Sequence, residues 1–157
     1  MSFGRDGLTC SVETAGQIRT IEVRNDLADL ERVTGILDEL WEHNAVEAEI
    51  RAELNIAVEE ILTNVIRHGG TGENAAQARI EVLPDRIEIE VRDRGVAFNP
   101  LEHPPPDTGL SLDERRPGGL GILLVRRMMD HTAYERRDGM NCFTMVKNRP
   151  GKPGLPQ

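Results

Sequence analysis

A glutamate and an asparagine four residues apart, Glu60 and Asn64, form the first pair in the sequence that could carry chemistry. Apolar residues recur around them at helical spacing, and a helix at about 100° per residue places both side chains at the margin of that apolar stripe. The asparagine oxygen suits magnesium, which takes few protein ligands, and the glutamate could accept a proton. Glu59 would point to solvent instead. An ordinary exposed helix surface would explain the same pair.

Two further segments place glycines beside groups that could hold a ligand. Asp93 ends an apolar strand and Gly95 follows it, so the carboxylate could accept a hydrogen bond from an exocyclic amine while the chain passes close to a flat ring. A simple turn would use the same residues. Residues 118–122, GGLGI, open a helix, and their amides could bind an anion or serve as a hinge. They form neither a P-loop nor a dinucleotide fingerprint, because no lysine follows the glycines and no strand leads directly into them.

Alternating and helical patterns of apolar residues predict the elements that would position these groups. Strands are expected at residues 17–24, 78–83, 86–92, 132–137 and 142–147, with residues 9–14 as a further strand paired with the first. Helices are expected from a cap at Asn25 or Asp26 to about His43, over residues 46–68 with a left-handed glycine cap at 69–70, and over residues 120–130. This order predicts an α+β fold, a two-layer α/β sandwich in which one mixed, mostly antiparallel sheet carries three helices on one face.

The 157 residues are expected to form a single domain over residues 1–147, followed by a flexible tail at 148–157. Residues 94–118 contain five of the nine prolines. A segment of that length is too long for a routine connection, so we predict a functional lid there.

The composition argues against several classes of partner. The net charge is −8, and residues 1–60 carry 14 acidic against 5 basic side chains, which would repel a phosphate backbone. Solvated helix faces or a basic partner would each explain this acidic half. The sequence shows no apolar run of the roughly 20 residues needed to span a membrane and no signal peptide. Cys10 and Cys142 form no CxxC pair, so we expect no zinc site. From the charge and the lack of a membrane-spanning run, we expect a cytoplasmic protein that binds neither nucleic acid nor membrane.

Taken in order, these motifs resemble the Bergerat-type (GHKL) ATP-binding fold shared by histidine kinases, gyrase-like ATPases and anti-sigma factor kinases. The closest likeness is to the stand-alone anti-sigma factor serine/threonine kinases of bacteria, and it extends over residues 18–147. It rests on four segments: AVEEILTNVIRH at 57–68, DRGVAFNP at 93–100, GGLGILLV at 118–125, and a closing hairpin with YER at 134–136 and NCFT at 141–144.

This resemblance implies ATP and magnesium as cofactors and assigns the central residues. Glu60 would be the catalytic base, and Asn64 would hold magnesium. Asp93 would receive the adenine amino group, and Gly95 would pass beside the ring.

The resemblance implies further contacts to ATP. Gly119, Leu120 and Gly121 would wrap the triphosphate. Thr144 would lie near Asp93 and share a water-mediated hold on adenine. Arg67 and His68 could approach the phosphates, or act only as cation and cap at a helix end.

The function that the resemblance implies is an ATP-dependent protein serine/threonine kinase. Members of that family hold a sigma factor away from RNA polymerase and phosphorylate a small antagonist (anti-anti-sigma) protein on Ser or Thr, and the family implies a homodimer. Ala97 and Glu59 depart from its pattern, since a glycine and a small residue are frequent at those places. A non-catalytic ATP-binding interaction module and a slow ATPase are the alternatives.

Overall fold

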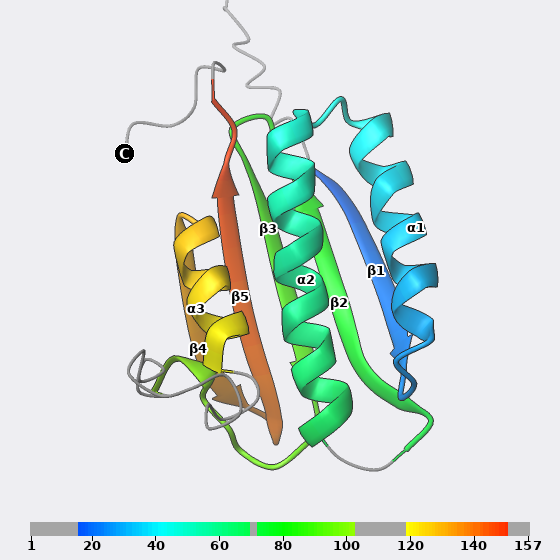
Figure 1. The fold of residues 1–157 in the computed structure, drawn as a ribbon, viewed down its shortest axis with the longest axis vertical. Coiled ribbons are helices and arrows are strands. Elements are labelled where there is room, and N and C mark those ends of the chain that lie inside the picture. Colours follow the sequence, from blue (N-terminus) through cyan, green and yellow to red (C-terminus); the bar gives the residue numbers. More distant parts are fainter. Residues whose placement is uncertain (1–15, 70–71, 103–118, 151–157) are drawn as a thin grey trace, which may run out of the picture.

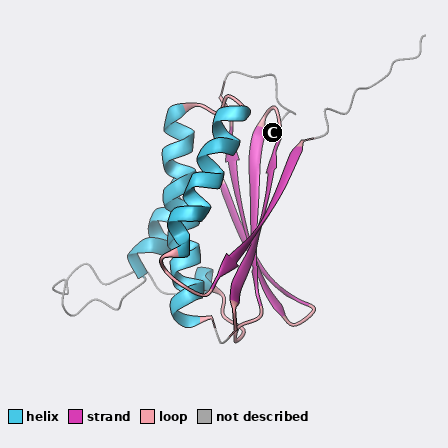
Figure 2. Cartoon of the chain, turned by 90° about the vertical axis from the view of Figure 1, so that its right-hand side faces the viewer, coloured by secondary structure: helices cyan, strands magenta, loops and turns pink. Residues whose placement is uncertain are grey.

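The computed structural model describes residues 16–69, 72–102 and 119–150, which form two layers, a five-stranded sheet and three α-helices (Figure 1). Seen from the side, the helices lie on one face of the sheet (Figure 2). The predicted α+β class is therefore confirmed. In chain order the elements are β1 (Gln17–Arg24), α1 (Asp29–His43), α2 (Ala48–His68), β2 (Asn74–Val82), β3 (Arg86–Asp93), a one-turn 3-10 helix (Pro100–Glu102), α3 (Gly119–Met128), β4 (His131–Arg137) and β5 (Met140–Asn148).

The strand order is β1-β2-β3-β5-β4, and each neighbouring pair among the described strands is antiparallel. The sheet is thus antiparallel throughout this region rather than mixed. The reason is topological: β3 and β4, which α3 connects, run in the same direction, but β5 inserts between them and pairs with both. This insertion brings the last described strand next to the end of β3, where Asp93 lies.

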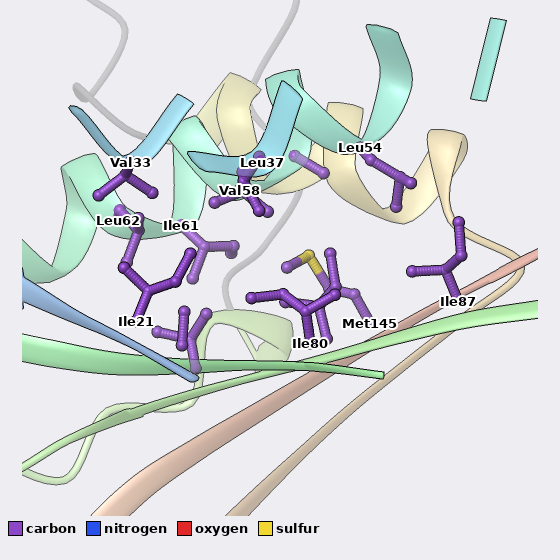
Figure 3. Packing of buried hydrophobic residues seen from close by; sticks show 14 of the residues in the cluster. Ile21, Val33, Leu37, Leu54, Val58, Ile61, Leu62, Ile80, Ile87 and Met145 are labelled. Atoms are coloured by element: carbon purple, nitrogen blue, oxygen red, sulfur yellow. The ribbon is translucent and has the colours of Figure 1, made fainter. Parts of the chain in front are cut away.

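Helix α2 lies over the middle of the sheet and supplies the largest part of the helical core (Figure 1). Its predicted apolar stripe is confirmed, since Ile50, Leu54, Ala57, Val58 and Ile61 are all buried. Figure 3 shows side chains of this stripe meeting apolar residues of the sheet, which come from four strands: Ile21, Ile80, Ile87 and Met145. Burial of this stripe fixes the rotation of α2 about its axis and therefore the direction of the polar side chains at its margin.

Helix α1 begins three to four residues later than its predicted cap. Asp26 accepts a hydrogen bond from the amide of Ala28 (2.9 Å), which forms a tight turn, and the helix starts at Asp29. The Asp29 carboxylate reaches back to the amide of Arg24 at the end of β1 (2.8 Å). A side chain inside the first helical turn, instead of a residue before it, therefore joins the strand to the helix. Leu27 precedes the helix and is 44% exposed.

Helix α2 ends at His68 as predicted, and Gly69, the residue that follows it, is not left-handed. Gly69 has φ −89° and ψ 0°, so its conformation is right-handed. A Cβ at this position would overlap the carbonyl oxygen of Val65. Close contact with the helix, and not a positive φ, explains the glycine. Gly70 lies outside the described residues.

At the C-terminal end, Asp138 and Gly139 form the predicted hairpin turn, with φ of 53° and 75°. Two residues assigned to the flexible tail are ordered: Asn148 belongs to β5, and Arg149 is buried. The Arg149 guanidinium contacts Glu47 and the carbonyls of Leu83, Asn44 and Ala45. The predicted strand at 9–14, most of the predicted lid (103–118) and residues 151–157 of the tail lie outside the described residues.

Candidate active site

The two adjacent glutamates of α2 point in different directions, as the helix geometry predicts. Glu59 is exposed, and Glu60 is half-buried. The carboxylate of Glu60 lies against Gly121 in the first turn of α3, so closely that a Cβ on Gly121 would overlap Glu60 Oε2. The candidate base therefore sits at the N-terminal end of the helix that the glycine motif opens.

Asn64 lies one turn beyond Glu60 at the same margin of α2 and is half-buried. Its side chain makes no hydrogen bond with the described part of the chain, so the amide oxygen is available to a ligand. A single neutral oxygen fits magnesium, which keeps most of its ligands as water and phosphate oxygens. No group of three or more His, Cys, Asp or Glu side chains suited to a metal occurs within the described ranges. Any magnesium here would depend on the nucleotide for its remaining ligands.

Asp93, the last residue of β3, is buried with 9% of its surface exposed. Its Oδ1 atom accepts two hydrogen bonds, from the amide of Gly95 (2.9 Å) and from Nδ2 of Asn141 (3.0 Å). No described residue donates to the other oxygen, Oδ2. One carboxylate oxygen is thus committed to the fold, and the second remains as an acceptor for a ligand.

Asn141 on β5 is a site residue that the motif comparison missed. Its Nδ2 donates to Asp93 Oδ1 and to the carbonyl of Val96 (2.9 Å), and its Oδ1 accepts from the amide of Phe98 (3.2 Å) and the hydroxyl of Tyr134 (2.6 Å). All four hydrogen-bonding positions of the amide are filled. Asn141 therefore holds Asp93 and the segment that follows β3 in one arrangement.

The structure corrects the expectation for Thr144. Thr144 pairs with Glu90 in the sheet register, whereas Asn141 pairs with Asp93. Because side chains alternate between faces along a strand, Thr144 projects from the face opposite to Asp93. Strand parity contained the signal: Phe143 and Met145 are apolar and buried, so Asn141 shares their face and Thr144 does not.

Gly95, just after β3, packs against Gly69, just after α2. A Cβ on Gly95 would overlap the carbonyl oxygen of Gly69, and it would lie 2.8 Å from Asp93 Oδ1. The carbonyl of Gly95 accepts a hydrogen bond from Arg136 on β4 (2.8 Å). Because Gly95 lies against both Gly69 and Asp93, Asp93 lies beside the C-terminal end of α2.

The candidate site consequently runs along the C-terminal half of α2. Gly121 marks one end, beside Glu60, and Gly95 marks the other, beside Gly69, with Asn64 between them. Nine residues of helix separate the two ends, roughly 14 Å at 1.5 Å per residue. That distance is comparable to the length of an extended nucleoside triphosphate.

The other predicted site residues lie around this line. Gly119 is the first residue of α3, Leu120 is 43% exposed, and Gly121 is buried against Glu60. The first amides of α3 have no carbonyl partner within the helix, which favours an anion at this end. Arg67 and His68 are exposed in the last turn of α2, where their charge also complements the helix dipole. None of the helices in the described ranges is long and apolar enough to cross a membrane.

The chain was compared with known proteins. The family model described as the histidine kinase-like ATPase domain matches residues 23–147. The serine/threonine-protein kinase BtrW of Bordetella bronchiseptica is 32% identical over 103 residues, which cover 64% of this chain and 72% of that protein. The serine-protein kinase RsbW of Listeria monocytogenes is 33% identical over 95 residues, covering 57% of this chain and 60% of its own length.

The serine-protein kinase RsbW of Bacillus pumilus is 34% identical over 106 residues, covering 62% of this chain and 65% of that protein. Among solved structures, the RsbU and RsbW domains of Rv1364c from Mycobacterium tuberculosis match with a TM-score of 0.61 at 13% identity, over 87% of this chain and 33% of that one. That likeness concerns the fold alone. The resemblance read from the four sequence segments is confirmed, and the chain belongs to the histidine kinase-like ATPase domain family.

Proposed function

We propose that this chain is an ATP-dependent protein serine/threonine kinase that also sequesters a sigma factor and phosphorylates that factor's antagonist protein. Relatives named serine-protein kinases support the kinase activity, although the alignments span only 60% to 72% of the first two relatives. Sigma factor and antagonist are the partners implied by the family resemblance, together with a homodimer and a place in the cytoplasm.

The observation that carries the proposal is the pair of groups at the two ends of the C-terminal half of α2. At one end, Asp93 presents a carboxylate oxygen that no described residue uses. At the other, Glu60 lies beside the glycine start of α3. An acceptor for a base amine and a proton acceptor near an anion site, separated by a nucleotide's length, suit phosphoryl transfer from ATP.

The mechanism follows from these positions. Asp93 Oδ2 would accept a hydrogen bond from the 6-amino group of adenine, and the first amides of α3 would face the phosphates. Asn64 would hold magnesium, whose chemistry is to neutralise charge on the phosphate oxygens. Glu60 would take the proton from a serine or threonine hydroxyl of the substrate while that hydroxyl oxygen bonds to the γ-phosphorus. The bond from that phosphorus to the β–γ bridging oxygen breaks, and ADP leaves.

A labelling experiment tests this function. The purified protein is incubated with magnesium and ATP labelled at the γ-phosphate, together with each protein encoded beside its gene. Label on a serine or threonine of one of those proteins supports the kinase. Release of labelled phosphate without labelled protein indicates the slow ATPase, and ATP-dependent binding of a partner without transfer indicates the non-catalytic module.

A further inference from the structure

Asn141 and Asp93 face one another across the β3–β5 pair, and Asn141 has no role in the chemistry proposed above. We propose that Asn141 is a positioning residue that fixes the rotation of the Asp93 side chain and thereby selects a 6-aminopurine nucleotide. This inference rests on the proposed function, because it concerns the same nucleotide site. Asn141 acts through Asp93 and does not contact the base in this account.

The Asn141 amide can adopt only one orientation. Two donors, the Phe98 amide and the Tyr134 hydroxyl, meet its oxygen, and two acceptors, Asp93 Oδ1 and the Val96 carbonyl, meet its nitrogen. Turning the amide by 180° would set its oxygen against two acceptors, Asp93 Oδ1 and the Val96 carbonyl. Its nitrogen would meet the Phe98 amide, another donor, and only the Tyr134 hydroxyl, which can also accept, could keep its hydrogen bond. In a buried setting, each such loss leaves a polar group without a partner. Asn141 is therefore a fixed donor toward position 93.

The side chain at position 93 is fixed in turn by two donors. The amide of Gly95 and Nδ2 of Asn141 both point at Oδ1, so this atom must be an acceptor. Aspartate satisfies the requirement and leaves Oδ2 as a second acceptor. An asparagine at position 93 would have to place its oxygen at the Oδ1 position, which leaves its nitrogen, a donor, facing the ligand.

The group at position 6 of the purine base reveals whether residue 93 presents an acceptor or a donor to the ligand. The 6-position of adenine carries an amino group that donates, and that of hypoxanthine carries a carbonyl that accepts. An acceptor at Asp93 Oδ2 favours ATP, whereas a donor at that place favours inosine triphosphate (ITP). The preference should therefore reverse in Asp93→Asn, and the reversal should depend on Asn141.

The experiment measures dissociation constants for ATP and ITP with magnesium by calorimetry. The proteins are wild type, Asp93→Asn, Asn141→Ala and the double variant, with Asn148→Ala as the control on the same strand. We expect wild type and the control to prefer ATP by about tenfold or more, the order of one charged hydrogen bond. Asp93→Asn should prefer ITP. The preference for ATP should shrink at least about fivefold in Asn141→Ala. The preference for ITP should shrink in the double variant, where the Gly95 amide alone holds the side chain at position 93.

Two results would overturn the inference: a preference for ITP in the double variant as large as in Asp93→Asn, or equal weakening of both nucleotides in Asn141→Ala. If Asn141→Ala does not fold, Tyr134→Phe removes one of the four hydrogen bonds that hold the amide of Asn141 in place. In that variant a narrowed ATP preference supports the inference, and an unchanged preference contradicts it. Wild-type protein that discriminates ATP from ITP but labels no partner would overturn the proposed kinase function and leave this inference standing.

Discussion

The carboxylate of Glu60 on α2 occupies the space that a side chain at position 121 of α3 would fill. The contact joins the candidate base to the glycine motif, two features that lie far apart in the sequence. It also gives Gly121 a role besides leaving its amide open to phosphate. The glycine makes room for the carboxylate of Glu60.

Gly121→Ala should lower phosphoryl transfer by roughly tenfold or more and change folding stability by less than about 1 kcal/mol. The overlapping atom is the end of a flexible side chain, so Glu60 can swing away at little cost, and alanine is the better helix former. A displaced carboxylate cannot take the proton of the substrate hydroxyl. Transfer assays and urea denaturation on the same preparation measure both effects. Normal transfer in a variant that folds normally would contradict the assigned place of Glu60.

Gly95→Ala should destabilise the protein by about 1–3 kcal/mol, because its methyl group meets the backbone carbonyl of Gly69 and overpacking against backbone is costly. Gly35→Ala is the matched control. Gly35 is exposed in α1, and a Cβ added there would meet no atom within 4 Å, so alanine should raise stability by about 0.5–1 kcal/mol. Urea denaturation measures both variants. Equal effects of the two substitutions would contradict the close approach of β3 and α2.

Glu60→Gln and Glu59→Gln form a second matched pair. Glutamine keeps the size and polarity of Glu60 but cannot accept the proton, so transfer to the partner should fall by roughly 10²–10⁴ while ATP affinity is retained. Glu59 is exposed on another side of α2, and its substitution should leave transfer within about twofold. Initial rates of labelling with saturating ATP test the pair. Equal rates for Glu60→Gln and wild type would remove Glu60 from the catalytic role.

Asn64→Ala tests the magnesium assignment through binding alone. The variant should bind ATP about tenfold more weakly than wild type when magnesium is present, because one ligand of the ion is lost. With a chelator in place of magnesium, the two proteins should bind ATP equally. Calorimetric titrations under both conditions make the comparison. An equal loss of ATP affinity in the absence of magnesium would show that Asn64 contacts the nucleotide directly.

Asp29 makes stability depend on pH at the acidic end. The side-chain hydrogen bonds from Arg32 (2.7 Å), aided by the amide of Arg24, lower the pKa of Asp29 from 3.8 to about 2. A carboxyl whose pKa is lower in the folded state stabilises the fold above its unfolded pKa, and it loses that contribution as pH falls through the folded value. The contribution of up to about 2 kcal/mol at neutral pH should therefore disappear between about pH 4 and pH 2.

Denaturation of wild type and Asp29→Asn at several pH values checks this dependence. Asparagine cannot titrate and cannot form the ion pair with Arg32. The difference in free energy of unfolding between the two proteins should be largest above about pH 5 and should shrink toward about pH 2. A difference that stays constant over this range would contradict the lowered pKa.

Local sequence patterns predicted most of the elements. The apolar stripe of α2 identified which side chains face the sheet, and Glu59 and Glu60 separated as the helix geometry required. The closing hairpin was also predicted, and its turn forms at Asp138-Gly139, where both residues adopt a positive φ. These features depend on neighbours within one or two turns of chain, which the sequence displays directly.

Features that depend on distant contacts were less predictable. The start of α1 shifted because the Asp29 carboxylate bonds back to Arg24 in β1. The motif resemblance pointed to Thr144, whereas the register of β5 against β3 places Asn141 beside Asp93. Parity with the buried residues of β5 would have identified the face of Asn141, but not its partner, since pairing between strands is set by the assembled sheet.

The insertion of β5 between β3 and β4 also determines when this protein can become active during its synthesis. A nascent chain that has emerged from the ribosome only as far as β3 carries Asp93 but has no Asn141 to orient it, and one edge of β3 is unpaired. Such an edge is open to pairing with other chains until β5 arrives. The contact between Asn141 and Asp93 and the pairing of the second edge of β3 thus form together and late, so an incomplete chain lacks the arrangement that we propose selects the nucleotide.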